Sequence, residues 1–403
     1  MFFKRIIPYV LSFVFLGGSI VYVAQPDMKH PTVKQVNAPA VYETEKPADE
    51  IRGVWVTYMT LDVENEADKE SAFKDKISAI IDDMESANLN TMIVQVRPFC
   101  DAIYPSRFYP WSHILTGTQG EDPGYDPLSY IVETAHDHDI MVHAWLNPYR
   151  VTTKDTPSQL SDDNPVIKDP ELSVEVNESL YLNPSSDKAI ELITDGAKEI
   201  VEKYDVDGIQ FDDYFYPPDC GDFDADDYAA YCDKTDSTLS LEDFRKENVS
   251  RMVRSVYQAI HSTEENVLFG ISPQGNLSNN SELYADVQKW CAEKGYIDYI
   301  CPQIYFSLDN PALTFEDGLK DWLDTEKHDR LSLYIGIPAY KAGTDADSGT
   351  WLDNDDILKT EIEIIRDDRL DGFMLYSYDS FHNDDNAQEV ENVIRYLNTS
   401  PTQ

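Results

Sequence analysis

The chain has 403 residues, of which 42% are hydrophobic and 12% aromatic, so its composition is that of a globular protein with a large core. The formal net charge is −43, from 75 acidic and 32 basic residues. Because a field of that sign repels nucleic acid and anionic lipid, neither is expected as a partner of the folded body. The length suits one α/β barrel with long loops.

The first 24 residues predict a membrane-targeting segment. Lys4 and Arg5 precede an apolar run from Ile6 to Ala24, which is long for the core of a signal peptide and close to the length of a spanning helix. Residues 1–24 are therefore either a signal anchor or a cleaved signal peptide. Both place the body outside the cytoplasm, anchored to the cytoplasmic membrane or secreted. Residues 25–49 lack periodicity and predict a flexible linker.

From residue 51 onward, apolar segments alternate with stretches of helical period. The first amphipathic stripe runs from Phe73 to Met84, and later helices are expected to begin at the capping residues Asp126, Ser240 and Thr314. The expected strands are residues 52–60, 91–97, 140–147, 208–211, 267–272, 299–306, 332–339 and 372–378.

Eight strand–helix units in alternation predict an α/β fold, a (β/α)8 TIM barrel over residues 50–398. The strand segments are apolar throughout, as parallel strands covered on both faces should be. The rival architecture, a doubly wound open sheet, lacks support because no GxGxxG motif follows the first strand.

The segment DGIQFDDYFYP at residues 207–217 places two adjacent carboxylates, Asp212 and Asp213, at the end of a buried strand. Carboxylates there are costly unless they are paired, hydrogen-bonded or used. In a TIM barrel, the carboxyl end of a strand is where catalysis takes place. Since side chains alternate, Gln210 and Asp212 share one face, and Asp213 faces the helices unless a bulge turns it inward.

The residues that follow the other strands are amides, aromatics and arginines, a mixture that suits sugars, with their apolar ring faces and hydroxyl edges. We expect a polysaccharide to be bound by Arg97, Asn147, Tyr149, Arg150, Gln210, Tyr214, Gln303, Tyr305, Tyr340, Tyr376 and the loop residue Trp111. The strand ends contain no spacing typical of a metal ligand set, a phosphate loop or a serine or cysteine nucleophile, so no metal or cofactor is expected.

Glycoside cleavage needs a carboxylic acid that protonates the leaving oxygen and a second carboxylate that acts as base or nucleophile. Asp212 is the first choice for one role, and its partner is Asp213, Asp101 or Asp379, in that order. Two neighbouring carboxylates repel each other when ionised, which raises one pKa and creates a proton donor near neutral pH. The alternative is a structural pair that caps a loop and forms an ion pair with Arg97 or Arg150.

Several segments together resemble the bacterial glycosyl-hydrolase-like family 10. They are RGVWVTYMTL (52–61), QVRPFCDAIYPSRFYPWSHILTGTQGEDPGYDPL (95–128), HAWLNPYRV (143–151), DGIQFDDYFYP (207–217), ISPQGN (271–276), CPQIYF (301–306) and DGFMLYSY (371–378). The resemblance spans about residues 50–395. It implies a (β/α)8 barrel that hydrolyses a β-linked polysaccharide, in some members peptide-free peptidoglycan strands. Cys100 departs from the Gly expected before Asp101.

The sequence therefore predicts a monomeric, extracytoplasmic glycoside hydrolase. Arg97, Arg150 or Lys341 would hold acidic or polar substituents of the glycan. Two alternatives remain open, namely a non-catalytic glycan-binding barrel and a metal-dependent polysaccharide deacetylase. Among the five cysteines, Cys220 and Cys232 flank an acidic loop and are a candidate disulfide.

Overall fold

The computed structural model describes residues 42, 46–47, 49–235 and 238–400. The predicted targeting segment and most of the predicted linker lie outside these residues. Within the described part of the chain, no helix is both long and apolar enough to cross a membrane.

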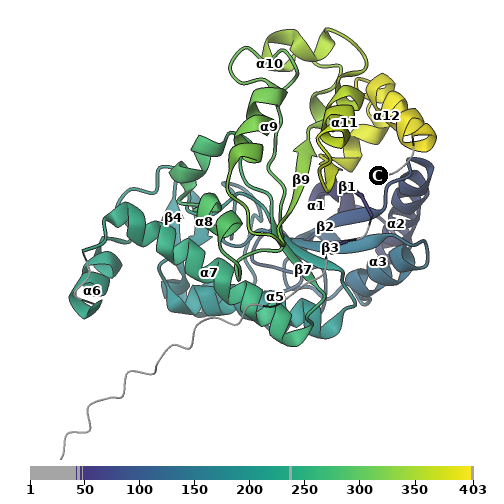
Figure 1. The fold of residues 1–403 in the computed structure, drawn as a ribbon. Helices are drawn as coiled ribbons and strands as arrows, with labels where there is room; N and C mark the ends of the chain where they lie inside the picture. Colours follow the sequence, from purple (N-terminus) through teal and green to yellow (C-terminus); the bar gives the residue numbers. More distant parts are fainter. Residues whose placement is uncertain (1–41, 43–45, 48, 236–237, 401–403) are drawn as a thin grey trace, which may run out of the picture. The chain divides into compact units, whose positions relative to one another are not determined.

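Eight parallel strands close into a barrel in their order along the chain, so the predicted (β/α)8 barrel is confirmed (Figure 1). The strands are β1 (Ile51–Val56), β2 (Thr91–Arg97), β3 (Met141–Leu146), β6 (Gly208–Phe211), β7 (Leu268–Ile271), β8 (Tyr299–Ile300), β9 (Ser332–Ile337) and β10 (Gly372–Leu375). Closure comes from β10, which pairs in parallel with β1, Ile51 opposite Gly372. The carboxyl ends of all eight strands therefore meet at one rim.

Each strand is followed by a helix that covers the outside of the barrel (Figure 1). These helices are α2 (Lys69–Ser86), α3 (Pro127–His136), α5 (Asp187–Lys203), α7 (Leu241–Thr263), α8 (Val287–Ala292), α9 (Phe315–Asp324), α11 (Ile357–Asp367) and α12 (Ala387–Thr399). The predicted caps are confirmed at Asp126, Ser240 and Thr314, whose side chains accept hydrogen bonds from backbone N–H groups in the first turn.

Two separate apolar clusters follow from the alternation of side chains along each strand. One lies between strands and helices. The other consists of strand residues together with Cys301, which follows β8. It fills the inside of the barrel with large rings such as Trp55, Trp145 and Tyr299. Gly270 makes this filling possible, because a Cβ atom at that position would overlap the ring of Tyr299. The barrel is thus a packed support beneath its rim.

Several predicted strands extend past their observed ends, and two of them do so by four residues or more. Residues 299–306 yield only Tyr299 and Ile300 as strand, because Pro302 has no N–H to continue the ladder. Residues 52–60 end as strand at Val56, where Thr57 caps the short helix α1 (Tyr58–Leu61).

The sequence analysis missed a hairpin in the long loop after β3. Strands β4 (Ser173–Val176) and β5 (Ser179–Leu182) pair antiparallel around Asn177 and Glu178, which have φ values of 51° and 63°. Two sequence signals usually reveal a hairpin, a glycine in the turn and long alternating strands on either side. This turn has positive φ angles but no glycine, and each strand has only four residues, so both signals are missing. Leu182 donates its N–H to the carbonyl of Tyr149, and Val151 donates to that of Leu180, so the hairpin braces the segment that carries Arg150.

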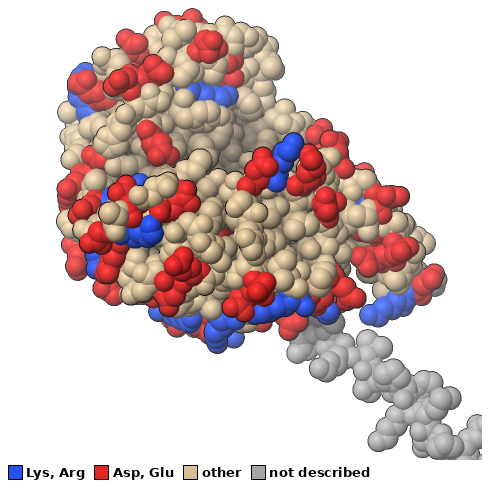
Figure 2. Space-filling view, turned by 180° about the vertical axis from the view of Figure 1, so that it is seen from behind, with Lys and Arg blue, Asp and Glu red and all other residues tan. Residues whose placement is uncertain are grey.

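Acidic side chains spread widely over the face in Figure 2, and basic ones are fewer. This distribution agrees with the net charge of −43.

The tight interior of the barrel predicts that Gly270→Ala destabilises the protein by about 1–3 kcal/mol, because the added methyl group forces the ring of Tyr299 to move. The matched control is Gly318→Ala in α9, where a Cβ would make ordinary contacts at 3.4 Å and helix propensity improves. Thermal unfolding of both variants checks this. Equal melting temperatures for the two would contradict the packing described here.

Candidate active site

Asp212 lies directly after β6 with its side chain at the mouth of the barrel and only 5% exposed. Its Oδ2 accepts hydrogen bonds from Trp145 Nε1 and Asn147 Nδ2, both at 3.0 Å, which come from and just after β3. Its Oδ1 is buried and has no hydrogen-bond partner among the described residues. One oxygen is therefore anchored, and the other is left to carry a proton.

Burial is the main reason why the pKa of Asp212 rises from 3.8 to about 7. The charge of Asp213 raises this pKa further, whereas Arg150 and the hydrogen bonds from Trp145 and Asn147 lower it. An acid with a pKa near 7 keeps its proton in a large fraction of molecules at neutral pH and is suited to general acid catalysis.

Asp213 also lies at the mouth and does not turn toward the helices, so the simple alternation expected for residues 210–213 fails at the strand end. Its two oxygens accept hydrogen bonds from the amide groups of Gln274 and Gln303, the latter at 3.2 Å. Burial raises the pKa of Asp213, and both amides oppose that rise. Asp213 accepts a hydrogen bond on each oxygen, whereas Oδ1 of Asp212 accepts none. A single proton bound to this pair is therefore held preferentially by Asp212.

Arg150 brings a positive charge close to this pair. Its backbone N–H donates to Asn147 Oδ1 at 2.8 Å, and its Nε donates to the carbonyl of Pro98 at 3.0 Å. The guanidinium group lies over the rings of Phe99 and Tyr214, at 4.8 and 5.6 Å from their centres. Tyr214 itself is 51% exposed, so its ring is open to a ligand.

Three tyrosines from the opposite strands form an aromatic cluster beside the carboxylates. Tyr305, Tyr340 and Tyr376 have ring centres 5.7 to 6.0 Å apart, and Trp55 contacts Tyr376 from inside the barrel. Burial chiefly raises the pKa of Tyr376 to about 12, and the charge of Asp212 adds to it, which places the cluster within electrostatic reach of the site. Tyr340 is 44% exposed. Such rings can stack on sugar faces.

The structure corrects the roles expected for Arg97, Tyr149 and Lys341. Arg97 and Tyr149 are fully buried and present nothing to a ligand at the rim. Lys341 forms an ion pair with Asp347 at 3.0 Å and donates to the carbonyl of Tyr305. Of the three predicted cations, Arg150 remains as a candidate for substrate binding.

The other predicted carboxylates do not join the pair. Asp101 is fully buried, where it accepts from the N–H of Phe99 and from Gln119 Nε2. Asp379 is exposed at the rim and accepts from the hydroxyl of Thr60 at 3.0 Å. Asp213 is therefore the second carboxylate that the geometry favours.

Two further predicted residues take supporting places. Gln210 lies two residues before Asp212 on the same face of the strand. It is fully buried, and both of its amide atoms lack hydrogen-bond partners among the described residues.

Trp111 is half-buried and lines a pocket of about 320 Å³ together with residues 105–110. Trp145 is not among the predicted site residues, yet its indole N–H donates to Asp212. Because side chains alternate along a strand, Trp145 shares the face of Asn147, and this pattern could have identified it.

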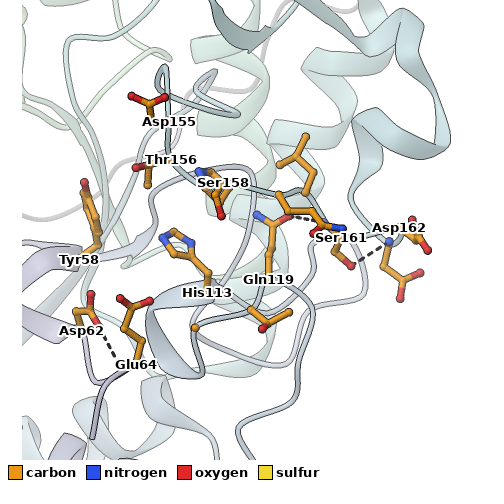
Figure 3. A pocket seen from close by; sticks show the side chains of 16 residues that line it. Tyr58, Asp62, Glu64, His113, Gln119, Asp155, Thr156, Ser158, Ser161 and Asp162 are labelled. Carbon is orange, nitrogen blue, oxygen red and sulfur yellow. Dashed lines mark hydrogen bonds between the residues drawn. The ribbon is translucent and has the colours of Figure 1, made fainter.

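A pocket of about 780 Å³ lies next to the site, between α1, the 3-10 turn His113–Leu115 and residues 155–163 (Figure 3). Tyr58 forms its edge and contacts the ring of Phe99 at 5.0 Å, and Phe99 in turn underlies Arg150. The pocket is lined mostly by hydroxyl, amide and carboxylate groups, and its lining includes no lysine or arginine. Its lining includes neither Asp212 nor Asp213.

All five cysteines are free, so the candidate disulfide between Cys220 and Cys232 is not formed. Cys220 is buried after the strand end, and Cys232 lies half-buried on α6 (Ala225–Thr235). Across the residues that the structure describes, no group of three or more His, Cys, Asp or Glu side chains is arranged to hold a metal ion.

Comparison with known proteins identifies relatives of this chain. The family model described as glycosyl hydrolase-like 10 matches residues 50–353. The chain is 36% identical over 332 residues to glycosyl hydrolase YngK of Bacillus subtilis, a match that covers 77% of this chain and 64% of that protein. It is 30% identical over 391 residues to glycosyl hydrolase DigH of Escherichia coli K12, with 88% of each covered.

Solved structures support the barrel. The glycoside hydrolase domain of PgaB (BpsB) from Bordetella bronchiseptica aligns with a TM-score of 0.55 at 12% identity, over 85% of this chain and 98% of that one. The endo-1,4-beta-mannanase of Rhizomucor miehei aligns with a TM-score of 0.54 at 12% identity, over 90% and 99%. At these identities the similarity concerns the fold.

The raised pKa of Asp212 predicts a pH-dependent stability difference. Between about pH 4 and 7 the unfolded chain loses this proton and the folded chain keeps it, so the free energy of unfolding falls as pH rises through that range. Asp212→Asn has no proton to lose and keeps an oxygen for both donors. The variant should therefore match wild type near pH 3.5 and exceed it by about 2–4 kcal/mol at pH 8. Denaturant titrations across pH test this, and parallel pH curves would contradict it.

Proposed function

This chain belongs to the glycosyl hydrolase-like 10 family, and on that premise we propose that it is a glycoside hydrolase that cleaves a β-linked polysaccharide. The observation that carries the proposal is the unequal environment of two adjacent buried carboxyl groups. Asp212 has one bare oxygen and a pKa raised to about 7. Asp213 has an amide donor on each oxygen. Such a division provides one acid and one carboxylate.

In the proposed reaction, Asp212 gives its proton to the glycosidic oxygen as the bond from that oxygen to the anomeric carbon breaks. The positive charge that develops on the sugar ring is stabilised by the carboxylate of Asp213. Asp213 then either takes a proton from the attacking water or forms the covalent intermediate that water hydrolyses. The configuration of the first product distinguishes these two courses.

The rim offers a surface for a polymer and not only for one sugar. The exposed large apolar side chains include Met59, Tyr214, Tyr340 and Leu352, which lie in segments that connect a barrel strand to its covering helix. Together with the pocket beside Tyr58, they extend the binding surface around the rim. Stacking rings and hydroxyl or amide edges are the groups that a glycan chain requires.

We propose a bacterial cell-wall glycan as the substrate, with peptide-free peptidoglycan strands as the leading candidate. Such strands carry a free carboxylate on every second sugar. Arg150 donates through Nε and its backbone N–H, and among the described residues no protein group accepts from its remaining guanidinium nitrogens. An arginine with a free planar edge suits a carboxylate.

An extracytoplasmic location belongs to the same proposal. The apolar run within residues 1–24 would deliver the body to the outer side of the cytoplasmic membrane, where the wall glycan lies. Fractionation of cells that express the full chain, with and without residues 1–24, tests this. Recovery of the full-length protein in the cytoplasm would contradict it.

The catalytic assignment predicts that Asp212→Asn lowers kcat on peptide-free peptidoglycan strands at least about 1,000-fold, and that Asp213→Asn lowers it about 100-fold or more. Release of reducing ends measures both effects. Asp379→Asn, an exposed carboxylate of the same rim, is the control and should keep wild-type activity. Glycan binding without new reducing ends from wild type would indicate a binding barrel, and release of acetate alone would indicate a deacetylase.

The role of Arg150 predicts that Arg150→Gln lowers kcat/KM about tenfold more on peptide-free peptidoglycan strands than on uncharged chitin oligosaccharides, because a hydrogen bond to a charged group is lost. The ratio between substrates removes any common effect on Asp212. Lys341→Gln is the matched control, since Lys341 is already paired with Asp347. An equal loss on both substrates would exclude recognition of a carboxylate.

A further inference from the structure

Arg97 is a buried charge without a counter-charge. It ends β2, is fully buried, and no carboxylate of the described chain lies within ion-pair distance of it. Its Nε and Nη1 lack hydrogen-bond partners there, and its guanidinium carbon lies 4.8 Å from the centre of the Tyr109 ring. A buried, unpaired guanidinium group is expensive.

The one strong contact of Arg97 is with the turn after β3. Its Nη2 donates to the carbonyl of Asn147 at 2.5 Å and to that of Pro148 at 2.9 Å. Two consecutive carbonyls held by one charged donor fix the peptide between them. The backbone of Asn147 is therefore held in place from beneath the rim.

Asn147 passes this constraint on to the site. Its Nδ2 donates to Asp212 Oδ2 at 3.0 Å, and its Oδ1 accepts the backbone N–H of Arg150 at 2.8 Å. Both partners are in the proposed catalytic centre. A shift of the Asn147 backbone would thus move a donor of Asp212 and the base of Arg150 together.

We propose that Arg97 is a positioning residue that acts through Asn147, holding this turn so that the Asn147 amide meets Asp212 and the Arg150 side chain faces the substrate. The inference rests on the proposed function, because it concerns the working geometry of Asp212. It replaces the expected contact between Arg97 and the glycan by an indirect role.

The titratable side chains around Arg97 include Cys100, Tyr104 and Tyr109. Burial raises the pKa values of Cys100, Tyr104 and Tyr109, so these neighbours stay neutral. Asp101, further along the same loop, accepts from Phe99 and Gln119. The groups that face Asp212 are Arg150, Asp213, Tyr214, Tyr376, Trp145 and Asn147. A change in the titration of Asp212 after substitution of Arg97 therefore reports on the Asn147 contact.

Arg97→Lys tests the proposal because it keeps the charge but loses the rigid guanidinium group that places Nη2 against both carbonyls. We expect kcat on peptide-free peptidoglycan strands to fall about 10- to 100-fold with KM changed less than about threefold. A weaker hydrogen bond from Asn147 favours the protonated form of Asp212, so the basic limb of the pH–rate profile should move to higher pH. Asn147→Ala should give the same shift, and the two changes combined should lose little more than either alone.

Arg366→Lys is the control for loss of a buried arginine, since Arg366 pairs with Glu50 at the opposite end of the barrel. It should lower the melting temperature and leave the pH–rate profile of wild type. An Arg97→Lys enzyme with the wild-type kcat and basic limb would overturn the proposal. So would an unchanged basic limb in Asn147→Ala, a variant that answers the question even where Arg97→Lys fails to fold.

Failure of this inference is distinguishable from failure of the proposed function. Activity that survives Asp212→Asn would remove the catalytic centre itself, whatever Arg97 does. Two results together would support the proposed function but contradict the role of Arg97. Asp212→Asn would be inactive, and the effects of Arg97→Lys and Asn147→Ala on kcat would multiply, which shows that Arg97 does not act through Asn147.

Discussion

Removal of water from two neighbouring carboxyl groups is the constraint on which the site depends. Asp212 and Asp213 are 5% and 4% exposed at the end of one strand, and both cannot hold full charge there without compensation. The barrel compensates the two carboxyl groups with different sets of hydrogen-bond donors. Donors from the β3 side leave one oxygen of Asp212 bare, whereas amides after β7 and β8 engage both oxygens of Asp213. Chemistry and stability are therefore opposed at this point of the fold.

The rest of the barrel serves to keep that arrangement rigid. The interior is filled by rings that glycines such as Gly270 accommodate, so the strand ends cannot shift independently. The aromatic cluster of Tyr305, Tyr340 and Tyr376 and the stack of Arg150 on Phe99 lie on opposite sides of the carboxyl pair. The centre is thus bordered by flat surfaces that suit sugar rings.

Much of this architecture was accessible from the sequence. Apolar runs alternating with amphipathic stretches identify eight strand–helix units, and capping residues such as Asp126 and Ser240 locate helix starts, because these signals are local. What the sequence left open depends on distant contacts. The burial of Arg97, the pairing of Lys341 with Asp347 and the inward position of Asp213 arise from partners 6 to 90 positions away. The hairpin after β3 lacks glycine and length, so its turn carried no signal.

That hairpin has a consequence for how the protein can vary. Strands β4 and β5 contact the segment 149–152 through backbone hydrogen bonds and so hold the position of Arg150, whereas Asp212 lies directly after β6. Under the proposed function, insertions or exchanges in residues 173–182 would change which glycan binds beside Arg150 and leave the positions of Asp212 and Asp213 unchanged. The β4–β5 hairpin can therefore be varied separately from the carboxyl pair. Libraries confined to these ten positions offer a route to altered selectivity while Asp212 and Asp213 are retained.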